Sequence, residues 1–425
     1  MGVFDIKAVQ NVDGIQKVNR CTVLKLMLDR NKISRADIAR MTGLHKATVT
    51  NIINEFSDMG IVSDCGQIVS ANGRKTAGLT LNLESVVVIA VRINRGTIDF
   101  GVCNMMGETT DRSQLSFRID EKIEKILDLI RQGITQMMAL AGTRKILCIS
   151  IAILGPMVRN KHKIAKVYDM PELGKVDVEE EVSKMFPGAK VFLDHDANMS
   201  TFAEWKSYKV ETGKTKGVML NLDFGVGIGG GIMIDGKLFR GSNGIAGEVG
   251  HMGIDFHAND AGYMNFKGIF ESYASPWVIK RDALNRLFEF QNSKITEDSS
   301  LEEIYGLYEK GDELAVWAVN RMCWFLAYGL SSIIYLINPD VVVLGDEIIR
   351  SQKFLMQLKQ DMKKFLPGDL VDALDIRFSK FKHGGMLLGA TMMAVDHYIE
   401  SLEILDFLKD KFPLKDKKSN QFCTE

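Results

Sequence analysis

The sequence predicts an α/β protein that has a small helix-rich N-terminal domain and a larger body of two similar lobes. Three observations support this prediction. Residues 34–59 contain two stretches of helical periodicity around a short turn at Gly43. From Val86 onward, apolar β-branched stretches alternate with amphipathic ones, as in α/β folds. The same order of elements begins again near Thr215.

Residues 32–82 have the features of a winged helix-turn-helix. Ser34 can cap the first helix, and Gly43 lies where the tight turn needs a residue that tolerates positive φ. The second helix is expected to begin near His45, and its apolar residues recur with helical spacing at Val49, Ile52, Ile53 and Phe56. A short β-hairpin that turns at Gly66 would then form the wing.

The predicted helix-turn-helix indicates DNA binding. The residues expected at the DNA are polar or cationic and suit phosphates and base edges: Ser34, His45, Lys46, Thr48, Thr50, Asn51, Arg74 and Lys75. The alternative is an ordinary three-helix module, because short turns with glycine are common. The succession of cap, turn, apolar stripe, hairpin and basic tip favours the DNA-binding interpretation.

Composition and charge agree with a protein of several domains. The chain has 425 residues, of which 46% are hydrophobic, and a net charge of −1. Residues 1–80 carry eleven Lys and Arg against seven Asp and Glu, so a basic head precedes an acidic body. The six cysteines are scattered without a CxxC pair, which argues against a disulfide framework. No apolar run approaches 18 residues and no signal peptide is recognisable, so we expect a cytoplasmic protein with no membrane contact.

The body is expected to have an actin-like (ribonuclease-H-like) architecture of the ATPase type, with a cleft between its lobes. Strands and helices follow one another in the same order in each half, which predicts two lobes of related topology. The expected boundaries are 1–82 for the DNA-binding domain, 83–200 for the first lobe, 201–400 for the second lobe and 401–425 for a C-terminal tail.

Residues 225–231, GVGIGGG, form a glycine-rich segment between two predicted strands. Gly225, Gly227 and Gly229 would let backbone N–H groups approach a phosphate without interference from a Cβ. Close packing inside a hairpin requires the same residues, so the segment alone leaves both interpretations open.

Several motifs resemble the ROK family of repressors and sugar kinases. They are GVGIGGGIMIDGKLFRGSNGIAGEVGHM (225–252), DHDAN (194–198), INPDVVVLG (337–345) and GIFESYAS (268–275). With the N-terminal SRADIARMTGLHKATVTNIINEFSDMGIV (34–62) and GRKTAGLTLN (73–82), the chain resembles the repressor branch, which includes xylose-type and N-acetylglucosamine-type regulators.

The resemblance implies that a sugar binds in the cleft through Asp196, Glu248, His251 and Glu271, with His195 beside them. Carboxylates and imidazoles suit a sugar because its hydroxyl groups both donate and accept hydrogen bonds. It further implies operator DNA and a monosaccharide effector as partners. Helix-turn-helix proteins usually bind half-sites as dimers, so we expect a homodimer, with a tetramer as the alternative.

Departures from the family pattern argue against kinase activity. Arg92 stands where the resemblance expects an acidic residue, Asn94 where it expects glycine, and Val226 where it expects threonine. Gly345-Asp346 replaces a double glycine near the expected adenosine position. We therefore predict a degenerate kinase domain in which the glycine loop is vestigial and Asp196 is the relic of the catalytic base. The alternatives are an active kinase with a DNA-binding domain, and a regulator that responds to a partner protein.

No metal or cofactor is expected. The resemblance implies a zinc site formed by one histidine and three cysteines, and His251 retains the histidine. The cysteine positions correspond to Gly262, Met264 and Ile269, whose side chains cannot bind zinc as a thiolate does.

Overall fold

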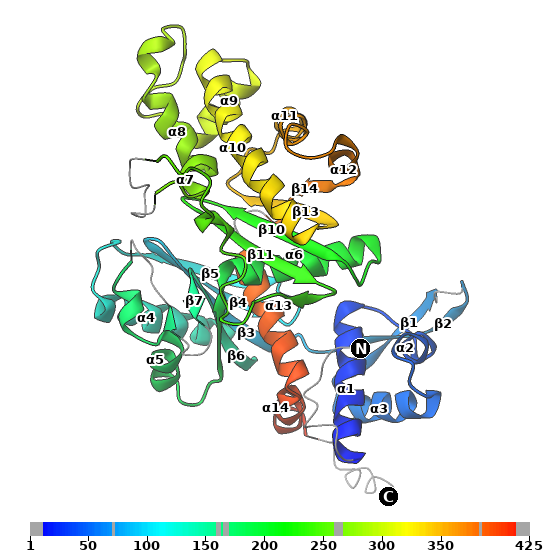
Figure 1. The fold of residues 1–425 in the computed structure, drawn as a ribbon. Helices are drawn as coiled ribbons and strands as arrows, with labels where there is room; N and C mark the ends of the chain where they lie inside the picture. The colour runs from blue at the N-terminus through cyan, green and yellow to red at the C-terminus, as the bar shows by residue number, and fades with distance from the viewer. Residues whose placement is uncertain are drawn as a thin grey trace, which may run out of the picture.

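The computed structural model describes residues 12–69, 73–158, 163–164, 170–258, 267–381 and 385–413. These residues form an N-terminal domain beside a body of two lobes, one stacked above the other in Figure 1. The predicted fold class is confirmed, because a winged helix-turn-helix precedes two α/β lobes of matching topology.

The N-terminal domain contains three helices and a two-stranded antiparallel sheet. Its elements are α1 (Val12–Asp29), α2 (Arg35–Thr42), α3 (Lys46–Asp58), β1 (Val62–Val69) and β2 (Lys75–Leu81). The helix-turn-helix forms for the reasons expected from its sequence. Ser34 Oγ accepts a hydrogen bond from Asp37 N–H at 3.1 Å, and Gly43 ends α2 with a φ of 74°. The predicted apolar face of α3 is buried.

The wing differs from the predicted hairpin. Gly66 lies inside β1, where the pairing register with β2 shifts, so it belongs to a bulge and not to the turn. The strand continues to Val69, and the chain returns through β2 from Lys75. Leu79 of β2 is buried and exchanges two backbone hydrogen bonds with Ile33, at 3.1 and 2.9 Å. This distant anchor fixes the pairing of β2 with β1, and thereby the position of the turn.

Both lobes contain a five-stranded sheet with the same strand order. An antiparallel meander supplies three strands, and two later strands join in parallel beside its first strand. In the first lobe the order is β5-β4-β3-β6-β9, with β3 (Val86–Asn94), β4 (Thr97–Asn104), β5 (Thr109–Ser116), β6 (Lys145–Ile153) and β9 (Val191–His195). In the second lobe it is β12-β11-β10-β13-β14, with β10 (Val218–Phe224), β11 (Ile228–Ile234), β12 (Lys237–Leu238), β13 (Val341–Asp346) and β14 (Asp375–Phe378).

Helices cover these sheets, and two of them lie between the lobes. The helices of the first lobe are α4 (Ile123–Ala141) and α5 (Val178–Met185), and its short strands are β7 (Met157–Val158) and β8 (Lys163–Ile164). Those of the second lobe are α7 (Glu271–Ala274), α8 (Pro276–Leu284), α9 (Leu301–Glu309), α10 (Glu313–Ile337), α11 (Gln352–Met362) and α12 (Gly368–Ala373). Helix α6 (Asp196–Thr212) packs on β10 and β11, and α13 (Gly385–Glu400) packs on β3, β4 and β6. Within the described ranges, no helix is long and apolar enough to span a bilayer.

The C-terminal segments depart from the expected boundaries. Residues up to 400 are expected in the second lobe, yet α13 returns to the sheet of the first lobe. The segment expected as a tail includes helix α14 (Glu403–Lys411), which buries Ile404, Leu405 and Leu408. These side chains belong to the same hydrophobic core as the N-terminal domain, and this burial accounts for the helix. Residues 414–425 lie outside the described residues.

Candidate functional site

A cavity of about 580 Å³ opens between the two lobes and contains all five residues expected to bind the sugar. Its volume lies within the range of small-molecule sites. The five residues come from three separate segments of the chain: His195 and Asp196, Glu248 and His251, and Glu271. The predicted glycines Gly225, Gly227 and Gly229 line the same cavity. The structure thus brings together the candidate residues that the sequence places up to 76 positions apart.

His195 and Asp196 lie at the junction of β9 and α6. The carboxylate before them, Asp194, is almost completely buried and is held by Arg240 at 2.6 Å and by Asn198 Nδ2 at 3.0 Å. This support fixes the strand end from which the two site residues project. His195 Nε2 lies 3.3 Å from Asp196 Oδ1, and His195 Nδ1 lies 3.9 Å from Glu248 Oε1. His195 therefore lies between two of the carboxylates in the cavity.

Glu271 has the most buried of the three carboxylates among the five residues. Its Oε2 accepts a hydrogen bond from Ile228 N–H at 3.2 Å. Burial raises the pKa of Glu271 above its ordinary value, although the Ile228 N–H, His251 and Arg95 act in the opposite direction. A Cβ on Gly227 would lie 2.5 Å from Glu271 Oε2, and one on Gly250 would lie 2.7 Å from it. Glycine at these two positions is what allows the carboxylate to reach the cavity.

The glycine-rich segment divides between a loop and a strand. Gly225 and Gly227 belong to the loop between β10 and β11, as a phosphate-binding interpretation requires. Gly229 instead lies within β11, where its added Cβ would be 3.2 Å from Ala197 Cβ of α6. Gly231 approaches Thr201 of the same helix more closely still, since a Cβ there would lie 2.0 Å from Oγ1. The second half of the segment is therefore explained by close packing of α6 against β11.

The hairpin of β3 and β4 contributes another part of the cavity wall. Arg92 and Asn94, two of the departures from the kinase pattern, line it together with Arg95 and Asp99. Arg95 is a site residue that we did not select from the sequence. The available signal was its place next to Gly96 in the tight turn after β3, beside two residues already noted. Val226 also lines the cavity, whereas the side chain of Asp346 lies outside the described residues.

The described residues do not fit the zinc site that the family resemblance implies. Ile269, at one of the cysteine positions, is a buried apolar side chain packed in the core. The other two positions, Gly262 and Met264, lie outside the described residues. Among the residues that the structure describes, no group of three or more His, Cys, Asp or Glu side chains is placed to hold a metal ion.

The proposed DNA face is a surface of α3 together with the wing. His45, Lys46 and Asn51 are exposed, and Thr48 and Thr50 are half-buried at the edges of the buried stripe of α3. Thr50 Oγ1 donates to Lys46 O at 2.9 Å, which leaves its lone pairs available. Arg74 and Lys75 are both exposed where β2 begins.

Ser34 is not available for DNA contact, contrary to our expectation. Its side chain is completely buried, and its Oγ caps α2 while also donating to Asp37 Oδ2 at 2.8 Å. Capping therefore uses the hydroxyl that the sequence analysis assigns to DNA. Arg40 binds the other oxygen of Asp37 at 3.0 Å, which completes this local arrangement.

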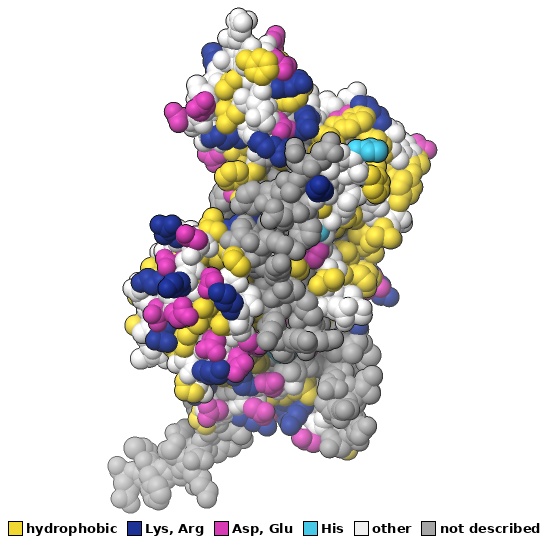
Figure 2. Space-filling model, turned by 60° about the vertical axis from the view of Figure 1, so that its left-hand side comes forward, with side chains coloured by type: hydrophobic (Ala, Val, Ile, Leu, Met, Phe, Trp, Pro, Cys, Tyr) yellow, Lys and Arg dark blue, Asp and Glu magenta, His cyan; other side chains and the backbone are white. Residues whose placement is uncertain are grey.

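The body offers a different surface from the wing. On the face shown in Figure 2, basic and acidic side chains are interspersed over the described parts of both lobes. No extended basic stripe crosses the described residues drawn there. Phosphate binding needs clustered cations, so the cations at the wing are better placed to contact DNA than this face of the body.

Comparisons with known proteins also distinguish the N-terminal domain from the body. A family model described as "ROK family" matches residues 88–397. A putative xylose repressor from Caldicellulosiruptor sp. (strain Rt8B.4) is 27% identical over 90% of this chain and 96% of its own length. Because the alignment omits only a tenth of this chain, it extends into the N-terminal domain that the family model does not reach.

Two solved structures show the same division by fold. A ROK family transcriptional regulator, described as a homologue of the E. coli MLC protein, has a TM-score of 0.77 at 22% identity. It covers 93% of this chain and 99% of its own. A ROK family glucokinase from Streptomyces griseus, in complex with glucose and AMPPNP, has a TM-score of 0.61 at 20% identity. It covers 72% of this chain and 98% of its own. A sugar kinase therefore matches a part about the size of the body, whereas the regulator matches nearly the whole chain.

Proposed function

Because the chain belongs to the ROK family, we propose that it is a sugar-responsive DNA-binding transcriptional repressor of carbohydrate-use genes. The observation that carries this proposal is the combination of an exposed winged helix-turn-helix with an interlobe cavity lined by carboxylates and imidazoles. A repressor of this kind acts on chromosomal DNA, so we place it in the cytoplasm.

We propose that the effector is a monosaccharide bound by Asp196, Glu248, His251 and Glu271, with His195 between the first two. Three carboxylates offer several acceptor oxygens to sugar hydroxyls, and the imidazoles can both donate and accept. D-xylose is the first candidate, since a relative aligned along nearly its full length is named as a putative xylose repressor. Binding between two lobes would favour a closed arrangement, and the closed body would change the affinity for operator DNA.

We propose further that the body binds sugar without phosphorylating it. Arg92 lines the cavity where a kinase of this family would carry an acidic residue near magnesium, which reverses the local charge. Asp196 would still suit a general base, but a base needs a bound phosphoryl donor in order to act. The alternative is an active sugar kinase with a DNA-binding domain. A coupled ATPase assay with D-xylose, D-glucose and N-acetylglucosamine distinguishes them, since sugar-dependent ADP release would establish the kinase.

On the DNA side, we propose that α3 enters the major groove and that the wing contacts phosphates. Because such modules bind paired half-sites, we expect a homodimer on a near-palindromic operator. We also propose that the protein works without zinc or another cofactor. Elemental analysis of purified protein should find far less than one zinc per chain, and one zinc per chain would contradict this.

The decisive variant for the effector site is Glu248→Gln, which keeps the size of the side chain but removes its charge. If Glu248 binds a sugar hydroxyl, the substitution should weaken D-xylose binding by about tenfold, corresponding to the loss of a charged hydrogen bond. Isothermal titration calorimetry measures this directly. Operator affinity in the absence of sugar should not change.

The matched control is Glu302→Gln, an exposed glutamate on α9 outside the cavity. It should leave both affinities unchanged. Equal D-xylose affinity in wild type and Glu248→Gln would place the sugar site elsewhere. If D-xylose does not bind the wild type, D-glucose and N-acetylglucosamine serve as probes in the same comparison.

A further inference from the structure

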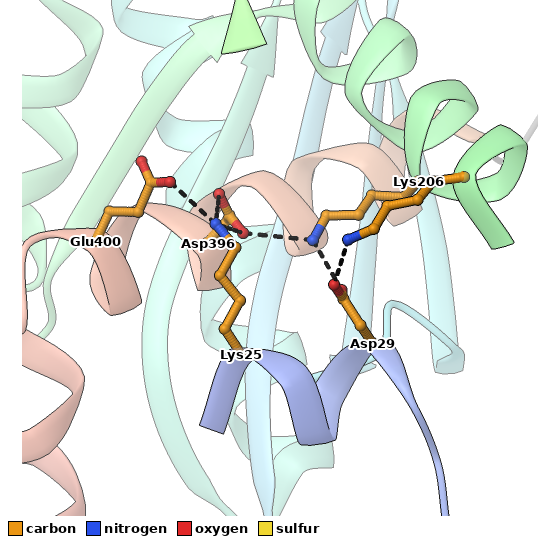
Figure 3. A network of polar contacts seen from close by, with 6 residues as sticks. Lys25, Asp29, Lys206, Asp396 and Glu400 are labelled. Atoms are coloured by element: carbon orange, nitrogen blue, oxygen red, sulfur yellow. Dashed lines mark hydrogen bonds and ion pairs between the residues drawn. The ribbon is translucent and has the colours of Figure 1, made fainter. Parts of the chain in front are cut away.

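Helix α1 of the DNA-binding domain is joined to the body by two groups of ion pairs (Figure 3). Lys25 Nζ lies 2.8 Å from Asp396 Oδ1 and 3.0 Å from Glu400 Oε1 of α13. One turn further along α1, Asp29 accepts hydrogen bonds from Lys206 at 3.0 Å and Lys209 at 2.6 Å, both on α6. We call these six residues the strap.

The two halves of the strap belong to different lobes. Helix α13 packs on the sheet of the first lobe, and Ser150 Oγ of β6 donates to Ala390 O of α13 at 2.8 Å. Helix α6 packs on the sheet of the second lobe, where Ser200 Oγ donates to Asp223 Oδ1 of β10 at 3.0 Å. Lys25 is therefore bonded to a helix of the first lobe, and Asp29 to a helix of the second lobe.

The two body helices pack against each other, and their backbones approach closely between the cavity and the strap. A Cβ on Gly389 of α13 would lie 2.2 Å from Met199 O of α6, so the helix backbones are in direct contact there. Asp196, in the cavity, lies about one turn before this contact on α6, and Lys206 lies two turns beyond it. A rotation of α6 against α13 about this contact would therefore move the cavity end and the strap end in opposite directions.

A rotation of α6 against α13 would change the contacts of Lys206. Its ammonium lies 3.0 Å from Asp29 Oδ1 and 3.4 Å from Asp396 Oδ1, so it contacts α1 and α13 at once. A small cavity of about 130 Å³ adjoins these groups and is lined in part by Met105, Met106 and Met392. Methionine side chains adapt readily to changes in packing, so the junction can rearrange without losing its core.

The ion pairs that Lys206 makes with Asp29 and Asp396 are sheltered from solvent. The side chains of Lys206, Asp29 and Asp396 are 19%, 17% and 13% exposed. Burial alone would raise the pKa of Asp29, but Lys206 and Lys209 outweigh it and hold the pKa below its ordinary value. Burial would likewise lower the pKa of Lys25, and Asp396 and Glu400 outweigh it. Sheltered pairs of this kind favour one geometry more strongly than exposed pairs do.

We propose that the strap couples the sugar cavity to the DNA-binding domain. In this mechanism, closure of the lobes around the sugar rotates α6 against α13, and the change in separation between Lys206 and Asp396 shifts α1 and with it α3. This proposal rests on the proposed function, because it assigns the route by which the effector acts. Asp29 and Lys206 are positioning residues that touch neither sugar nor DNA.

The test measures coupling separately from binding. The operator is a duplex selected by the wild-type protein from a random-sequence library, and D-xylose, D-glucose and N-acetylglucosamine are the sugar probes. In the wild type, the effective sugar should change the operator Kd by about tenfold or more. In Asp29→Asn and in Lys206→Gln, the operator Kd with sugar should differ from the operator Kd without sugar by less than about threefold. The sugar Kd without DNA and the operator Kd without sugar should each stay within about twofold.

Two further variants serve as controls. Asp29→Glu keeps the charge and should restore most of the coupling. Asp372→Asn makes the same chemical change at an ion pair with Lys363 in the second lobe, away from α1, and should leave the coupling unchanged. Thermal unfolding of each variant checks that it is folded.

The outcomes separate the two proposals. Unchanged coupling in both Asp29→Asn and Lys206→Gln overturns the strap and leaves the proposed function intact. Loss of sugar-free operator binding in both variants also overturns it, because the ion pairs would then only hold the domain in place. If none of the three sugars changes the operator affinity of the wild type, the proposed function fails, and the strap fails with it.

Discussion

The residues expected at the DNA come from one short stretch of chain and are mostly exposed, whereas the residues of the cavity come from distant segments and are largely enclosed. Lys46 and Asn51 are exposed on α3, which buries another face, and Arg74 is exposed just before β2. Glu271 reaches the cavity only because Gly227 and Gly250 leave room for it. The DNA face should therefore tolerate substitution without structural cost, while the cavity should be sensitive to the size of its neighbours.

The largest expected effect is on the DNA face. Replacing Arg74 and Lys75 together by Ala should weaken operator binding by about a hundredfold, if each cation makes one charged contact with a phosphate. The dependence of log K on log salt should become shallower by roughly one for each lost contact. Fluorescence anisotropy at several salt concentrations measures both quantities, and the melting temperature should hardly change.

The control for this variant is the pair Arg118→Ala and Arg131→Ala, two exposed cations on the first lobe. It removes the same number of charges and should leave the salt slope unchanged. If both double variants lower the slope equally, the wing has no special role at the DNA, and the contrast between the two regions fails.

A smaller effect is expected in the cavity. Gly227→Ala would place a Cβ about 2.5 Å from Glu271 Oε2, so the carboxylate must move and lose its hydrogen bond from Ile228 N–H. Sugar affinity should fall by about tenfold, as for the loss of one charged hydrogen bond. Calorimetry with the effective sugar measures the change. Gly306→Ala in α9, where an added Cβ meets nothing within 4 Å, should leave sugar binding unchanged.

The smallest effect concerns the junction between the two regions. The pKa of Asp29 is lowered in the folded protein, so its contribution to stability is present above the ordinary pKa of 3.8. This contribution is lost as the pH falls through the lowered pKa of Asp29 in the folded protein. At pH 7, Asp29→Asn should be about 1 kcal/mol less stable than the wild type, the upper end for an ion pair that keeps some exposure to solvent. Urea midpoints of the two proteins should converge below about pH 3.8. A constant gap at all pH values would mean that the charge of Asp29 has no part in stability.

The same contrast explains how much of the structure can be predicted from sequence. The ends of α2 and α3 follow from local signals, namely the Ser34 cap, the left-handed Gly43 and the apolar spacing of α3. The repeated order of strands and helices along the chain in the two lobes also follows from periodicity. The turn of the wing does not, because it depends on the pairing of β2 with Ile33 and β1.

Some of the site residues can likewise be identified from the sequence, and others cannot. The family motifs identify His195, Glu248 and Glu271 as neighbours, and the structure places all three on one cavity. Ser34 was misassigned because a short polar side chain at a helix start serves a cap as readily as a phosphate. The strap could not be anticipated, since Lys25 and Asp396 are 371 positions apart and no local pattern connects them.

The central claim is that the cavity and the DNA face are coupled, and thermodynamic reciprocity tests it most directly. The measurement is the Kd of the effective sugar by calorimetry, with and without saturating operator duplex. It is compared with the operator Kd measured with and without saturating sugar. We expect the two ratios to agree, at a value of about 10–150. A sugar that binds with the same Kd whether or not operator DNA is present would contradict the account.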